Sequence, residues 1–191
     1  MIRPLPLLAC LLAAAPALAQ GFSALKGHDN NAPIDISSDH FEAQDRADRA
    51  IWVGNVRAIQ GDMTMDAARM TVAYSHAAQP GGDPQINRID ASGGVTVVSP
   101  TERAKGNFGI YDLNRKLITL IGNVTLTRGT NTLNGARLVI DLNSGRATVD
   151  GNAVGGGTAS AANGGRVTGH FTVPKRAASS APATTGGTPP Q

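Results

Sequence analysis

The sequence predicts an all-β protein, and three observations indicate this. Side-chain polarity alternates with a period of two along most of the chain, a short unit recurs at regular intervals, and glycine is abundant while aromatic residues are scarce. Of 191 residues 23 are glycine, and only 4% are aromatic. Successive side chains of a strand point to opposite faces, so such alternation is typical of strands with one buried and one solvated face. No stretch has convincing helical spacing, and many short strands with tight turns suit the composition.

The N-terminus has the layout of a cleaved secretory signal peptide. One positive charge, Arg3, precedes an apolar run at 5–15, and Ala17-Leu18-Ala19 supplies the small residues of a cleavage site. The run is shorter than the roughly 18 apolar residues that a membrane helix needs. We therefore predict a signal peptide at 1–19 and a periplasmic location. A lipoprotein signal that ends at Cys10 is the alternative, but it leaves few apolar residues before the cysteine.

Cysteine content and charge narrow the possible functions. Cys10 is the only cysteine and would leave with the signal peptide, so we expect neither a disulfide nor a reactive or metal-binding thiolate. The net charge of +3 is too small to indicate nucleic-acid binding. We expect a flexible leader at 20–32, one folded domain at 33–173, and a disordered tail at 174–191 that is rich in Pro, Ala, Ser, Thr and Gly.

The alternation is clearest in four segments of the expected domain. Each places aliphatic or small residues on one face and mostly polar residues on the other. The residues of the first face, segment by segment, are Trp52, Gly54, Val56 and Ala58; Met70, Val72 and Tyr74; Ile118, Leu120, Gly122, Val124 and Leu126; and Leu138, Ile140 and Leu142.

A glycine-centred tripeptide recurs along the chain. Gly54-Asn55-Val56 is followed by Gly93-Gly94-Val95, by Gly122-Asn123-Val124 and, more loosely, by Gly151-Asn152-Ala153-Val154, at spacings of 39, 29 and 29 residues. Such a period indicates β units that each bury an apolar face only by stacking on their neighbours. We expect an elongated jelly roll or a short β-solenoid of antiparallel strands, whose interior is filled or lined by alternate side chains.

The order of several motifs resembles the OstA-like (LptA-type) family of periplasmic lipopolysaccharide-transport proteins. These motifs are a leading strand at 33–39, the Trp52 to Val56 element, Gly61 with Asp66-Ala67, the segment 109–113, and the closing segment 165–171. The resemblance covers nearly all of residues 34–173. It implies a twisted, V-shaped, open β-jelly roll that binds the acyl chains of lipid A.

The resemblance also implies partner proteins, and it implies that the protein itself catalyses no reaction. Family members join end to end into a bridge between an inner-membrane lipopolysaccharide transporter component and an outer-membrane translocon. It therefore implies a carrier without a catalytic step, cofactor or metal. The segment Tyr111-x-Leu113 matches a strand of the family, so both residues join the candidate lipid-binding set.

The remaining lipid-binding candidates follow from the alternation. We expect small and aliphatic side chains to face the interior, where they could shield hydrocarbon while sugars and phosphates stay in solvent. Ordinary core packing is the competing interpretation of each residue. The inward candidates are Ile34, Ile36, Trp52, Val56, Val95, Val97, Ile110, Leu120, Val124, Leu138 and Ile140.

The two terminal strands predict how copies of the protein associate with one another. The first, Ile34 to Ser38, carries one charge, Asp35, and the last, 166–173, carries only Arg166 at its start. Unpaired strand edges invite strand addition unless charge or proline blocks them. We expect head-to-tail homo-oligomers, because such a contact does not close on itself.

Other chemistry has weak support. His28, His40, His76 and His170 are scattered without ligand spacing. Ser38-Asp39-His40 contains triad residue types, but adjacent strand residues face opposite ways. Asp62, Asp66, Asp112, Asp141 and Asp150 suit turns or wet positions. Arg57, Arg69, Arg128 and Arg137 could meet lipid phosphates, although their alternation favours a solvated outer face.

Two functions from other classes remain open. One is a structural or adhesive β-solenoid of the envelope without lipid cargo. The other is a polysaccharide-active β-helix enzyme, which needs carboxylates clustered on one sheet face.

Overall fold

The computed structural model describes Leu25 and residues 27–76, 84–152 and 165–172. The predicted signal peptide, the tail at 174–191 and the end of the fourth glycine repeat lie outside these residues. The strands are β1 (Ile34–Ser37), β2 (His40–Gln44), β3 (Arg49–Gln60), β4 (Met63–Ser75), β5 (Gln85–Val98), β6 (Glu102–Asp112), β7 (Leu117–Arg128), β8 (Asn131–Asp141), β9 (Arg146–Asp150) and β10 (Thr168–His170), with one 3-10 turn, η1 (Asp45–Ala47).

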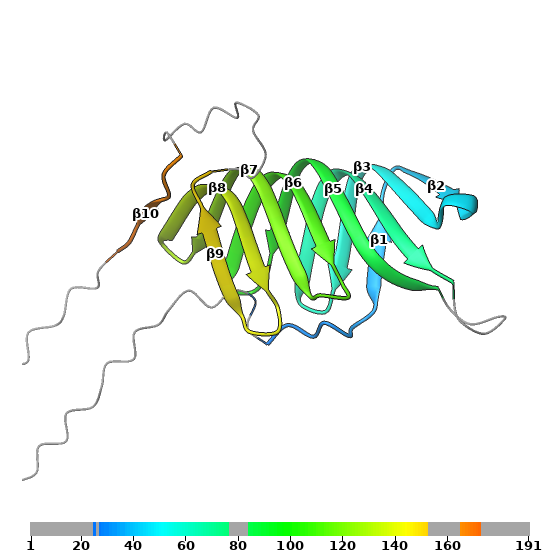
Figure 1. Ribbon diagram of the computed structural model, residues 1–191, viewed down its shortest axis with the longest axis horizontal. Helices are drawn as coiled ribbons and strands as arrows, with labels where there is room; N and C mark the ends of the chain where they lie inside the picture. The colour runs from blue at the N-terminus through cyan, green and yellow to red at the C-terminus, as the bar shows by residue number, and fades with distance from the viewer. Residues whose placement is uncertain (1–24, 26, 77–83, 153–164, 173–191) are drawn as a thin grey trace, which may run out of the picture.

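All ten strands form a single antiparallel sheet, which Figure 1 shows as a row of long, tilted strands. The order is β1-β3-β4-β5-β6-β7-β8-β10, with β2 also on β3 and β9 also on β8. Consecutive long strands from β3 to β8 pair directly, and short turns join β3 to β4, β5 to β6, β6 to β7 and β7 to β8. The predicted all-β fold is confirmed. In the described residues no helix is long and apolar enough to cross a membrane.

The glycine repeat marks a row of β-bulges across the middle of the sheet. The register shifts between Val53 and Val56, between Ser92 and Val95, and between Ile121 and Val124. At each place two residues oppose a single residue of the next strand, and these single residues are Ala68, Asn107 and Ala136. Bulges bend a strand and increase its twist.

Backbone geometry explains why glycine recurs in this row. Gly54, Gly93 and Gly122 have φ of 83°, 83° and 80°, in a region that side chains disfavour. The following residue also has positive φ, 46° at Asn55 and 49° at Asn123, and asparagine tolerates that conformation better than most residues. The repeat is therefore the signature of the bend.

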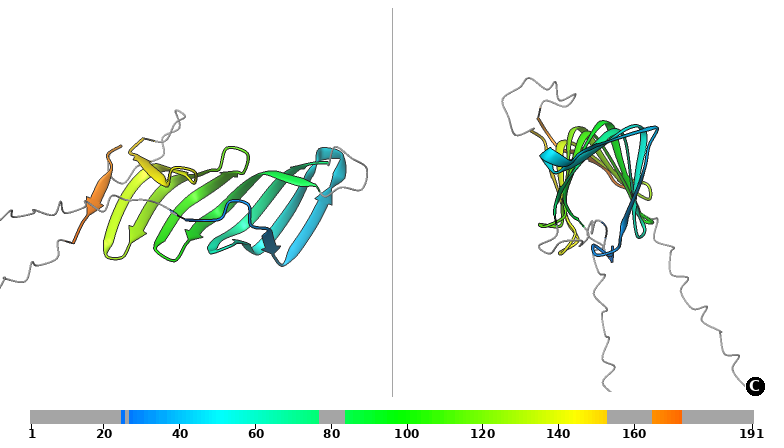
Figure 2. Two further views of the ribbon diagram at one scale, coloured as in Figure 1. Left: turned by 90° about the horizontal axis from the view of Figure 1, so that it is seen from below. Right: turned by 90° about the vertical axis from the view of Figure 1, so that its right-hand side faces the viewer.

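The bulge row divides each long strand between two walls that face each other. The first wall contains residues 56–60, 63–67, 95–98, 102–106, 124–128 and 131–135, and the second contains residues 49–53, 69–75, 85–92, 108–112, 117–121 and 137–141. Seen end-on in Figure 2, the sheet curls into a trough with one open side. A hydrogen bond joins the walls near that side, since the Tyr111 hydroxyl of the second wall donates to Gln60 Oε1 of the first at 2.8 Å.

Each end of the sheet consists of two short strands, one for each wall. At one end β1 pairs with Arg57–Gln60 and β2 pairs with Arg49–Val53. At the other end β10 pairs with residues 132–134 and β9 pairs with residues 137–141. Each full-length terminal strand is therefore covered by two half-length strands, and these half-length strands form the outer edges.

Candidate functional site

One continuous cluster of buried apolar side chains fills the trough along its length. Both walls contribute, because the residues on the concave face of each wall point toward the other. The cluster extends from Trp52 and Ile36 near one edge to Val149 near the other. Side chains less than 2% exposed include Val56, Met70, Ile89, Val95, Ile118, Leu120, Leu126, Leu138 and Ile140.

The structure places the candidate residues inward with one exception. Members of the buried cluster are Val56, Val95, Val97, Tyr111, Leu120, Val124, Leu138 and Ile140, and partly buried residues that pack against it are Ile34, Ile36, Trp52 and Leu113. Their inward facing follows from the alternation. Whether they contact lipid is a separate question.

The inward placement of Ile110 is wrong. It is only partly buried and lines an outer hollow together with Arg88, Arg115 and Arg137. The reason is the bulge, because Asn107 is the single residue opposite Gly93 and Gly94. A single unpaired residue exchanges the two faces of β6, so Ala104 points inward before it and Tyr111, 2% exposed, points inward after it.

The same effect hid other interior residues. Met63 and Met65 of β4 are 3% and 2% exposed, but they have the opposite parity to Met70 because Ala68 intervenes. Ile89 on β5 was also missed. Recognising the glycine repeat as a bulge would have revealed Met63 and Met65, whereas Ile89 has the same parity as Val95 and Val97 and could have been found from the alternation alone.

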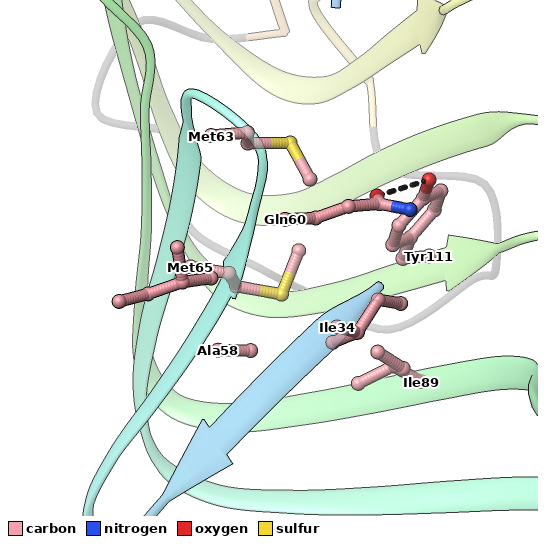
Figure 3. Close-up of a pocket in the computed structure, with 8 residues that line it drawn as sticks. Ile34, Ala58, Gln60, Met63, Met65, Ile89 and Tyr111 are labelled. Atoms are coloured by element: carbon pink, nitrogen blue, oxygen red, sulfur yellow. Dashed lines mark hydrogen bonds between the residues drawn. The ribbon is translucent and has the colours of Figure 1, made fainter. Parts of the chain in front are cut away.

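The described cavity inside the trough is small. Figure 3 shows it near the rim of the trough, lined by Ile34, Ala58, Gln60, Met63, Met65, Ile89 and Tyr111, and by Ile59. Its free space is barely enough for one water molecule. This cavity is therefore closed to a hydrocarbon chain in this state, and a guest that enters here must first separate side chains or move a segment.

A segment before β1 covers the open side of the trough. We refer to Leu25 and residues 27–32 as the strap. In the two views of Figure 2 the strap lies at the opening between the walls and runs along the length of the sheet. The strap falls within the expected leader at 20–32, and its Leu25 is 5% exposed and belongs to the buried cluster. Apolar periodicity gave no signal for it.

Gln60 holds the strap by a set of hydrogen bonds. Its Nε2 donates to the carbonyls of Asn30 and Ala32 at 3.2 and 3.0 Å. Its Oε1 accepts from the Tyr111 hydroxyl and lies 3.1 Å from His28 Nε2. Burial raises the pKa of Tyr111, and the Gln60 contact opposes part of that shift. The hydroxyl is therefore a neutral donor at ordinary pH.

His28 is itself buried, at 8% exposure. Its Nδ1 lies 3.0 Å from Asp62 Oδ1, and its Nε2 faces Gln60 Oε1. Asp62 and Gln60 therefore hold the His28 ring from both of its nitrogens.

A second polar contact holds the start of the strap. The Leu25 backbone N–H donates to Glu102 Oε2 at 3.1 Å, while Glu102 Oε1 has no hydrogen-bond partner and lies 3.8 Å from Arg128 Nε. The Glu102 side chain is 3% exposed. Burial raises the pKa of this carboxyl, and the Leu25 N–H and Arg128 oppose the shift.

The outer face carries ordinary ion pairs. Arg57 binds Asp66 at 2.7 Å, and Arg88 binds Asp90 at 2.7 Å. Such exposed pairs contribute little to stability. Arg128 differs from the expected solvated residue, because it is partly buried beside Glu102.

The triad residue types do not assemble. The Ser38 hydroxyl donates to the His40 carbonyl, and Asp39 accepts from Asn55. Across the described ranges, no group of three or more His, Cys, Asp or Glu residues could hold a metal ion.

Known proteins are similar to this chain in sequence. The family described as "LptA/(LptD N-terminal domain) LPS transport protein" matches residues 35–146. An uncharacterized protein of Rhizobium meliloti is 38% identical over 133 residues, which cover 66% of this chain and 72% of that protein. The LPS-assembly protein LptD of Yersinia enterocolitica is 32% identical over 90 residues, covering 47% of this chain but only 11% of LptD.

A solved structure has the same fold. LptH of Pseudomonas aeruginosa, described as the LptA-homologous periplasmic component of the conserved lipopolysaccharide transport device, superimposes with a TM-score of 0.64 at 16% identity. The match covers 76% of this chain and 99% of LptH. The resemblance found in the sequence is thereby confirmed: the chain belongs to the family of LptA and LptD N-terminal-domain lipopolysaccharide-transport proteins.

Proposed function

We propose that this protein carries the lipid A part of lipopolysaccharide through the periplasm, with the acyl chains inside the trough. The observation that carries the proposal is the continuous apolar cluster, which extends from the β1–β2 edge to the β9–β10 edge. A compact domain needs a core, but it does not need one that reaches both ends of an open sheet. The protein acts without a catalytic step.

The energy of shielding hydrocarbon supports this function. Each methylene group buried away from water contributes about 0.8 kcal/mol, so an acyl chain of about eleven methylenes gains roughly 9 kcal/mol in an apolar interior. Part of that gain offsets the cost of separating the closely packed side chains. Met63, Met65 and Met70 suit such rearrangement, because methionine is unbranched and adapts its shape.

The sheet edges support the second part of the proposal, a bridge of several copies. The β1–β2 edge of one molecule pairs with the β9–β10 edge of the next, so that both walls continue from copy to copy. This contact is heterologous and leaves a free edge at each end. The free ends would meet an inner-membrane lipopolysaccharide transporter component and an outer-membrane translocon.

Photo-crosslinking tests the cargo. Val97 is 2% exposed and faces the interior, whereas its neighbour Val98 faces outward and is only partly buried. A diazirine-bearing aliphatic residue at 97 should crosslink to lipopolysaccharide, and the same residue at 98 should not. Equal labelling at both positions, or labelling at neither, would contradict carriage in the trough.

Three further measurements test the bridge and the two alternative functions. Light scattering from low to high micromolar concentration should show growing head-to-tail assemblies, and an unchanged monomer would contradict the bridge. Reproducible absence of lipid A after gentle purification would favour the structural solenoid. Release of reducing sugars from glycans would favour the polysaccharide-active enzyme.

A further inference from the structure

The strap occupies the place through which a lipid must pass. It runs along the open side of the trough, and Leu25 belongs to the apolar cluster beneath. The cavity beside Gln60, whose side chain holds the strap, has room for barely one water molecule. Entry of hydrocarbon from the open side therefore requires the strap to leave.

The strap is also less firmly attached than any long strand. Strands β3 to β8 are held by continuous ladders on both sides. The strap is held by the Leu25 N–H, by the two Gln60 contacts and by His28. Local opening begins at segments with few buried contacts and no ladder.

The chemistry of the strap matches that of the proposed cargo. Leu25 presents an apolar side chain to the interior and, next to it, a backbone N–H to Glu102. An acyl chain that ends in an amide or a hydroxyl group offers the same combination. Once the strap has left, Glu102 needs a hydrogen-bond donor again, because a buried acceptor without a partner is costly.

We propose that the strap is a built-in competitor of the lipid, which fills the mouth of the trough in the empty protein and is displaced when an acyl chain with a donor group enters. This inference rests on the proposed function, because it concerns access to the same interior. It adds an autoinhibited state, because the apparent affinity equals the intrinsic affinity multiplied by the fraction of molecules whose strap is open.

The test compares two truncations of equally buried residues. Leu25 and Ile51 are both 5% exposed, but Ile51 lies outside the interior cluster on the outer face of β3. Purified lipid A is titrated into the full mature protein, into Leu25→Ala and into Ile51→Ala. Leu25→Ala should bind at least about tenfold more tightly, because its strap opens more often, and Ile51→Ala should bind like the unmodified protein.

Hydrogen–deuterium exchange gives an independent readout. In the unmodified protein, saturating lipid A should accelerate exchange of the backbone amides at 27–32 while the amides of β5 to β7 stay protected. Tight lipid binding with unchanged protection of 27–32, or equal affinity of Leu25→Ala and the unmodified protein, overturns the strap proposal but leaves lipid carriage standing. Failure of all three proteins to bind lipid A overturns both.

Discussion

Adding a single methyl group to a glycine of the bulge row should test whether close contact at the bulge shapes the sheet. Gly93 has φ of +83°, and a Cβ placed on it would lie 2.6 Å from the Cβ of Ala68. Gly94 has nearly the same φ, +84°, but a Cβ there meets nothing within 4 Å. Gly93→Ala therefore combines backbone strain with a steric clash, while Gly94→Ala tests the strain alone.

The magnitudes separate the two variants. Placing alanine in the left-handed region costs roughly 1–2 kcal/mol, and forcing extra volume against packed neighbours costs about 1–3 kcal/mol more. We expect Gly94→Ala to lose about 1–2 kcal/mol of unfolding free energy and Gly93→Ala about 2–5 kcal/mol. Urea denaturation at 25 °C measures both, and an unchanged slope with urea would show that the unfolding reaction is the same.

A second substitution makes the reasoning refutable. Ala68→Gly removes the atom that the new methyl group meets. In the Gly93→Ala background it should therefore recover most of the unfolding free energy that the clash removes, and a double-mutant cycle measures this recovery. Equal losses for the two glycine variants, or no rescue by Ala68→Gly, would mean that close contact across the bulge does not shape the sheet.

Three further outcomes are expected. Val97→Asp should destabilise the protein by several kcal/mol because it buries an unpaired charge, while Val98→Asp on the outer face should change the unfolding free energy much less. Similar losses of unfolding free energy in the two variants would contradict the assignment of Val97 to the inner face and Val98 to the outer face. Tyr111→Phe should cost about 0.5–1.5 kcal/mol in urea denaturation because Gln60 loses the donor that joins the two walls, and an unchanged stability would show that this bond is dispensable. Burial raises the pKa of Glu102, so the folded protein binds a proton at this carboxyl more tightly than the unfolded chain does. The contribution of Glu102 to stability is therefore present at pH below its ordinary pKa and is lost as the pH rises through the raised pKa. Glu102→Gln should therefore stabilise the protein at alkaline relative to acidic pH, and parallel stability curves for the two proteins would contradict the buried charge.

The bulge row also explains how one sheet forms a two-walled trough. In a flat sheet Gln60 and Tyr111 would lie far apart on opposite sides of the bulge row, yet their side chains are hydrogen-bonded. The bend between them comes from the Gly-Asn and Gly-Gly pairs, whose positive φ values belong to the bulges. A local backbone feature repeated at each long hairpin thus sets the global shape.

Much of the architecture could be predicted from the sequence, because the signals are local. Alternation with a period of two is a direct consequence of strand geometry, so it predicted the all-β class and the inward facing of residues such as Val56, Leu120 and Leu138. The repeat predicted stacked units, and the order of motifs indicated the family.

Only the tertiary structure decided where the inward and outward faces of a strand change places and which segment covers the open side of the trough. The wrong placement of Ile110 arose because parity holds only between bulges, and the position of a bulge depends on the partner strand. The strap left no trace in the pattern, because Leu25 is a single apolar residue whose burial depends on Glu102 and Gln60, far away in the chain. Local periodicity can therefore be read along one strand, but contacts between distant segments exist only once the sheet has folded over on itself.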